Sequence, residues 1–144
     1  MSILRTDEQA DAQEILKLII ETTDFYRAMG EILTEENIHH QLFEIANERE
    51  GYIEPFQKLV KELDEFPDSP DSDKELVDEL RGKITKLLSA DLKNAIFDKC
   101  LKKDELLAEA VNNTELSEQS TEFKKLLDSL YEHLANTKKR LSNN

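Results

Sequence analysis

Residues 38–52, IHHQLFEIANEREGY, contain the side chains of this sequence with the clearest potential to bind a metal ion. His39 and His40 are adjacent, and three glutamates follow them in the same segment. Imidazole nitrogens and carboxylate oxygens are common protein ligands of zinc, iron and manganese. Residues four positions apart share one face of a helix, so His40 and Glu44 could belong to one site. The segment therefore fits either a metal-binding helix or a bundle helix whose charged side chains face water.

A dinuclear iron or manganese centre in a helical bundle sets a stricter requirement. It takes glutamates from two helices and a Glu-x-x-His pair from each of the other two. At these positions the second helix presents Arg49 and Tyr52, and an arginine is no ligand because its guanidinium stays protonated. We therefore expect no catalytic residues, no metal and no cofactor. The alternative is an iron or manganese site, whose ligands would be Glu21, Glu48, Asp104 and Glu132.

Two further kinds of reactive site have little support in the sequence. His40 and Glu44 have the local spacing of a hemerythrin-like iron site, but such a site needs more histidines than the three present. Cys100 is the single cysteine, and the lysines near it in its helix could lower its thiol pKa. It has no obvious histidine base, and a lone cysteine in a helix is more often a core residue. We therefore expect no nucleophilic catalysis.

The spacing of apolar residues predicts an all-α chain that forms one domain over residues 1–144. Three glycines and three prolines suit long helices better than folds that need many turns. Gly30 lies near the end of the first expected helix, where a C-cap glycine is common. Five helices are expected, at about 6–29, 35–64, 73–88, 91–111 and 120–141.

The second of these helices has a seam of residues in alternating steps of four and three, as in a coiled coil. The seam consists of Ile38, Leu42, Ile45, Arg49, Tyr52, Phe56, Leu59 and Leu63. Arg49 needs an acidic partner if it is buried; otherwise its side chain reaches water from the edge of the seam. Pro55 lacks a backbone donor and crowds the carbonyl of Gly51, so we expect a kink or a short break at 51–55.

The formal net charge of −13 argues against nucleic acid and anionic membranes as partners. One cysteine forms no intramolecular disulfide, and no apolar run approaches the roughly 18 residues of a membrane-spanning helix. The first residues, MSILRTDEQADAQ, lack the apolar core of a signal peptide. These features predict a cytoplasmic protein with no membrane partner.

Short links join the first two helices and the last two, and a long connection with the helix at 73–88 joins the pairs. This connectivity is typical of ferritin-like four-helix bundles, and an up-down bundle of five short helices is the alternative. The segments ETTDFYRAM and HQLFEIANEREGYIEPFQKLVKEL resemble the first hairpin of a bacterial ferritin-like domain family of unestablished function. The resemblance covers about residues 10–141 and includes Phe25-Tyr26, Ala46 with Arg49, Ala95-Ile96 and Lys103-Asp104-Glu105.

This resemblance implies that Arg49 lies opposite Asp104 or Glu105, with Glu21 or Asp24 nearby. An Arg–carboxylate pair would then occupy the place where ferritin relatives hold their metals. The chain departs from the family in its long connection, where Arg81 alone is near the expected His-Arg and Trp signature, and Lys103 replaces a glycine. The predicted buried polar site consists of Arg49, Asp104, Glu105 and Tyr52.

Three functions are compatible with these features. The first is a non-catalytic structural or protein-interaction module, with a stress-related role as one option and a homodimer as one form of partner. The second is an iron- or manganese-binding oxidoreductase or metal-storage relative. The third is a helical adaptor that docks a partner helix in a groove opened by a kink at 51–55. We favour the first, because the dinuclear ligand pattern is largely missing.

Overall fold

The computed structural model describes residues 7–32, 39–63, 89–118 and 120–142, and every element in these ranges is a helix. The all-α prediction is therefore confirmed for this part of the chain. The expected helix at 73–88 lies outside the described residues. The elements are α1 (Asp7–Ile32), α2 (His39–Glu50), α3 (Ile53–Glu62), α5 (Ser89–Asn113), the short 3₁₀ helix η2 (Leu116–Glu118) and α6 (Thr121–Ser142).

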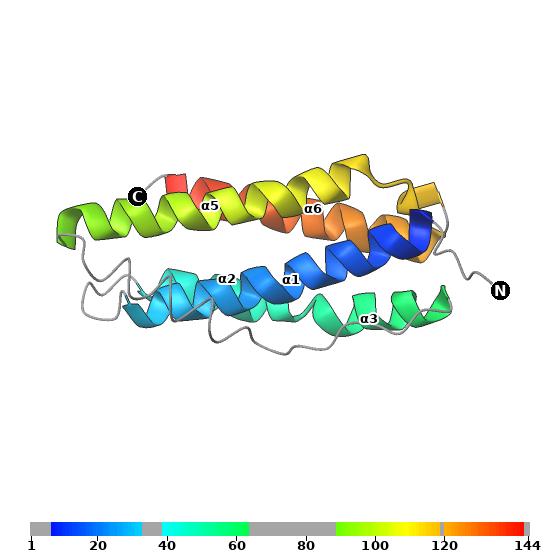
Figure 1. Cartoon of the computed structure of the whole chain (residues 1–144), viewed down its shortest axis with the longest axis horizontal. Helices are drawn as coiled ribbons and strands as arrows, with labels where there is room; N and C mark the ends of the chain where they lie inside the picture. The colour runs from blue at the N-terminus through cyan, green and yellow to red at the C-terminus, as the bar shows by residue number, and fades with distance from the viewer. Residues whose placement is uncertain (1–6, 33–38, 64–88, 119, 143–144) are drawn as a thin grey trace.

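The long helices lie side by side as a bundle (Figure 1). Side-chain contacts at one end of the bundle give their directions. The start of α1 meets the end of α3 through Gln9 and the carbonyl of Leu63. It also meets the residues after α5 through a 2.8 Å hydrogen bond from Thr114 to Asp11. Helix α1 is therefore antiparallel to both α3 and α5, and α3 and α5 are parallel to each other.

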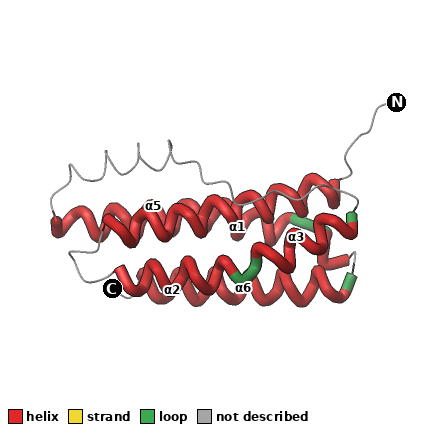
Figure 2. The backbone as a smooth tube through the Cα atoms, turned by 90° about the horizontal axis from the view of Figure 1, so that it is seen from below, coloured by secondary structure: helices red, strands yellow, loops and turns green. Residues whose placement is uncertain are grey.

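The second expected helix, 35–64, is broken into α2 and α3 at Gly51 and Tyr52 (Figure 2). The backbone tightens there, because the amide of Gly51 donates to the carbonyl of Glu48 and that of Tyr52 donates to Arg49. Pro55 is the third residue of α3. A helix leaves its first amides without intrahelical acceptors, so the missing donor of Pro55 costs nothing at this position. The predicted disruption at 51–55 is thus a short break.

Gly30 does not cap the first helix as expected, because α1 continues to Ile32. It is buried where α1 meets α2. A Cβ atom on Gly30 would lie 2.7 Å from the ring of Phe43, which is closer than carbon atoms pack. The absence of a side chain at this position thus allows α1 to approach Phe43 closely.

The apolar interior consists of two clusters, one in each half of the bundle. The first joins the N-terminal half of α1, α3, the C-terminal half of α5 and the N-terminal part of α6, with Ile19, Phe56, Leu107 and Leu130 among its fully buried residues. The second joins the C-terminal half of α1, α2, the N-terminal half of α5 and the end of α6, and includes Met29, Ile45 and Cys100. Arg49 and Asp104 are buried where the two clusters meet.

The start of α6 provides a test of helix capping. The Oγ of Ser120 accepts a 3.1 Å hydrogen bond from the backbone amide of Phe123, as an N-cap residue does. We expect Ser120→Ala to lower the free energy of unfolding by about 1 kcal/mol, measured by urea denaturation. Thr121→Ala, one residue later on the exposed surface, is the control, and an equal loss in both variants would contradict the capping role.

Candidate functional site

An ion pair between Arg49 of α2 and Asp104 of α5 lies at the centre of the bundle. Arg49 is 0% exposed and Asp104 is 6% exposed. The two guanidinium NH groups of Arg49 donate separately to the two carboxylate oxygens of Asp104, at 2.5 Å and 3.0 Å. Burial alone would lower the pKa of Arg49, but the charge and hydrogen bonds of Asp104, together with Tyr26, outweigh burial and raise the pKa, so the guanidinium stays charged. Two opposite charges therefore satisfy each other away from water.

Tyr26 of α1 is a second hydrogen-bond partner of the Asp104 carboxylate. Its hydroxyl donates a 2.7 Å hydrogen bond to Asp104 Oδ2, and its ring lies 4.8 Å from the guanidinium carbon of Arg49. The guanidinium thus has both a carboxylate and an aromatic face as partners. Burial, reinforced by the negative charge of Asp104, raises the pKa of Tyr26 far above its ordinary value. Tyr26 therefore acts as a hydrogen-bond donor and not as a base.

His133 of α6 is the fourth member of this network. Its Nε2 accepts a 3.2 Å hydrogen bond from Nε of Arg49, so the ring proton belongs on Nδ1. Burial, the charge of Arg49 and the charge of Arg140 together lower the pKa of His133 to about 4. His133 is therefore neutral near pH 7, and its Nδ1 points toward Glu48, whose Oε2 is 4.0 Å away.

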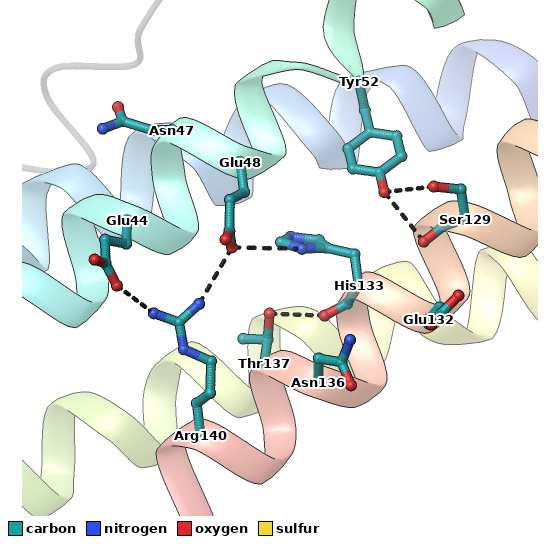
Figure 3. Close-up of a pocket in the computed structure, with 10 residues that line it drawn as sticks. All are labelled: Glu44, Asn47, Glu48, Tyr52, Ser129, Glu132, His133, Asn136, Thr137 and Arg140. Atoms are coloured by element: carbon teal, nitrogen blue, oxygen red, sulfur yellow. Dashed lines mark hydrogen bonds and ion pairs between the residues drawn. The ribbon is translucent and has the colours of Figure 1, made fainter.

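A polar pocket of about 850 Å³ opens above His133, between α2 and α6 (Figure 3). At one end, Arg140 of α6 bridges Glu44 and Glu48 of α2 at 2.7 Å and 3.2 Å. At the other end, the hydroxyl of Tyr52 lies 2.8 Å from the Oγ of Ser129. The remaining lining residues are Asn47, Glu132, Asn136 and Thr137, together with His133. The pocket is thus walled by carboxylates, amides and hydroxyls.

The four residues of the predicted polar site do not all lie together. Arg49 and Asp104 are brought together in the core. Glu105 was expected beside them, but it is exposed, because adjacent residues on a helix point about 100° apart and Asp104 takes the inward direction. Tyr52 was expected to be buried, but it lies half-buried in the pocket wall, where it bonds Ser129 and not the ion pair.

The four candidate metal ligands do not meet. Glu21 is exposed on α1 and pairs with Lys17 on the same helix, and Glu48 is held by Arg140. Asp104 is engaged by Arg49 in the core, while Glu132 lies in the pocket wall. Across the described residues, no three histidine, cysteine, aspartate or glutamate side chains come close enough together to hold a metal ion.

The structure also shows the surroundings of Asp24 and Cys100. Asp24, expected near Arg49, is half-buried close to Arg27 and Glu50, and burial raises the pKa of its carboxyl. Cys100 is fully buried, and burial raises its thiol pKa, which opposes the lowering expected from nearby lysines.

A second, smaller pocket beside the helix break is lined mainly by charged and amide side chains, with Ile53 as its one apolar residue.

Sequence reasoning missed the contributions of Tyr26 and His133. Tyr26 was predicted on the inward face of the first helix, but nothing indicated what its hydroxyl would bond. His133 follows Leu130 by three residues, so it lies on the same inward side of α6, and that spacing was the available signal.

Comparison with known proteins places the chain in no family: no family model, no curated protein and no solved structure matches it. None of the described helices is both long enough and apolar enough to span a bilayer. The resemblance to ferritin-like domains therefore stays a hypothesis.

Removing the guanidinium tests the central ion pair. We expect Arg49→Ala to lower the free energy of unfolding by about 3–5 kcal/mol, because it leaves the Asp104 carboxylate buried without its counter-ion. Arg27→Ala is the control, since Arg27 pairs with Glu50 at the surface and should contribute less than about 1 kcal/mol. Equal losses in urea denaturation would contradict a special role for the buried pair.

The neutral state of His133 predicts a specific pH dependence. The folded-state pKa of about 4 lies below the ordinary value of 6.5, so the unfolded chain binds the proton first. The contribution of His133 to the free energy of unfolding should be fully present above pH 6.5. It should fall by about 3 kcal/mol as the pH is lowered to about 4. His133→Gln, which cannot titrate, should lack this component. Identical pH profiles for both proteins in urea denaturation would contradict it.

Proposed function

We propose that this chain is a non-catalytic helical bundle that acts as a protein-interaction module. The arrangement of the buried carboxylate carries this proposal. Both oxygens of Asp104 are engaged, one by Arg49 alone and the other by Arg49 and Tyr26. These three hydrogen bonds occupy three of the roughly four lone-pair directions of the carboxylate, and the buried guanidinium of Arg49 already supplies its positive partner.

The proposal includes a ferritin-like arrangement in which a guanidinium replaces the metal ions. The support is the direction of the helices, with α3 parallel to α5, and the position of Arg49 among α1, α5 and α6. In a bundle that holds two metals, inward carboxylates from several helices share the cationic charge. Among the residues that the structure describes, Asp104 is the one buried carboxylate, and the one buried positive charge, that of Arg49, matches it.

The interaction role is supported by the charge of the molecule and by its reactive groups. A net charge of −13 creates a field that attracts basic surfaces and repels nucleic acid. Tyr26 and Cys100 are both buried, and both have pKa values raised above their ordinary values. Their environment therefore favours the protonated, unreactive forms. A protein partner, a second copy of the chain included, fits this surface better than a substrate does.

Metal analysis tests the proposal directly. We expect protein expressed with iron and manganese supplied, and purified without chelator, to contain far less than one metal per chain. Its melting temperature should not change when either metal is added, because a ligand stabilises a fold only if it binds the native state. Asp104→Asn serves as the control for any weak binding at the surface.

About two metals per chain, together with stabilisation that Asp104→Asn abolishes, would overturn the proposal in favour of the iron- or manganese-binding alternative. Metal that is bound equally well by Asp104→Asn would place the ion at the acidic surface and leave the central ion pair as described.

A further inference from the structure

Polar side chains bridge α6 to α2 and to the turn that follows α2. Arg140 contacts Glu44 and Glu48, His133 accepts from Arg49, and Tyr52 bonds Ser129. Ser129, His133 and Arg140 lie along one side of α6, and the pocket of about 850 Å³ follows them (Figure 3). Side chains of this kind leave room for water or for another molecule, which close apolar packing does not.

The charge of the pocket favours a cation. Three carboxylates line it, from Glu44, Glu48 and Glu132, against one guanidinium, from Arg140. Arg140 occupies the space between Glu44 and Glu48 and shows that a guanidinium fits there. The side chain of Glu132 forms no hydrogen bond or ion pair with any other residue in the described part of the chain. It is therefore available to a positive group from outside.

The floor of the pocket provides an independent observation. The His133 side chain is 9% exposed, and its Nδ1 carries the proton because Nε2 accepts from Arg49. This N–H donates no hydrogen bond within the described residues, since the closest carboxylate oxygen, from Glu48, is 4.0 Å away. A buried donor without an acceptor is costly, so the site gains free energy when an oxygen atom fills this position.

The ring of Tyr52 forms a third recognition element. It lies 5.6 Å from the imidazole of His133, on the wall opposite Arg140 (Figure 3). Its hydroxyl is fixed by Ser129, which holds the ring in place. A positive group that reaches Glu132 could also contact this aromatic face.

We propose that the pocket binds a basic peptide segment of a partner protein. A main-chain carbonyl of the peptide accepts the proton of His133 Nδ1, and a lysine or arginine side chain of the peptide pairs with Glu132. A peptide supplies both groups at once, whereas a simple inorganic cation supplies no acceptor. The inference rests on the proposed interaction function and names the class of partner and the surface that binds it.

The test uses fluorescein-labelled short peptides with lysine or arginine at varied spacings, an uncharged peptide and spermine. Binding is followed by fluorescence polarisation, and the site is located by NMR chemical-shift changes in the whole chain. We expect the basic peptides to shift the imidazole signals of His133. Glu132→Gln should weaken binding about fivefold, since one partly exposed ion pair is lost. Glu105→Gln removes the same charge from the exposed face of α5 and should change the affinity by less than about twofold.

Three results would overturn the inference. They are equal effects of Glu132→Gln and Glu105→Gln, shifts that map away from α2 and α6, and binding of spermine as tight as that of the peptides. Absence of binding by every basic peptide would overturn it as well. The metal analysis is independent of all these measurements, so failure of this site and failure of the non-catalytic proposal can be told apart.

Discussion

The organisation of this bundle depends on burying one positive and one negative charge at its centre. Arg49 and Asp104 are stable there only because each meets the other and because hydroxyl and imidazole groups occupy the remaining positions. Each of these four groups comes from a different helix: α1, α2, α5 or α6. A shift of any helix by one turn would leave a buried polar group without its partner. The network therefore fixes the helix register more strictly than apolar packing does.

The sequence predicted the part of this arrangement that follows from periodicity. Arg49 was recognised because it falls on an apolar seam, and Pro55 indicated the break because proline lacks a backbone donor. The choice of partner was harder, because acidic residues are abundant and several of them flank Asp104. Its inward direction was nevertheless detectable, since Cys100 precedes it by four residues and Leu107 follows it by three, and both are fully buried. The bonds of Tyr26 and His133 depend on helices distant in sequence, which periodicity within one helix does not report.

Polar and apolar contacts have separate tasks in this fold. Apolar side chains join α1 to its neighbours and form the two core clusters. Polar side chains cross between α2 and α6, above the ion pair, and these are the residues that face the pocket. The same imidazole that completes the buried network through Nε2 presents Nδ1 to the pocket. His133 thus belongs both to the buried polar network and to the wall of the pocket.

The division of the interior into two apolar clusters has a consequence for how the molecule unfolds. The two apolar clusters meet at the polar network, close to the break between α2 and α3. Cooperative unfolding spreads through contiguous apolar packing, and a layer of charged groups interrupts it. Each half of the bundle is therefore a candidate foldon, with the ion pair as the boundary between them. In native-state hydrogen exchange, α3 and the start of α6 would then exchange as one unit, separately from α2 and the start of α5.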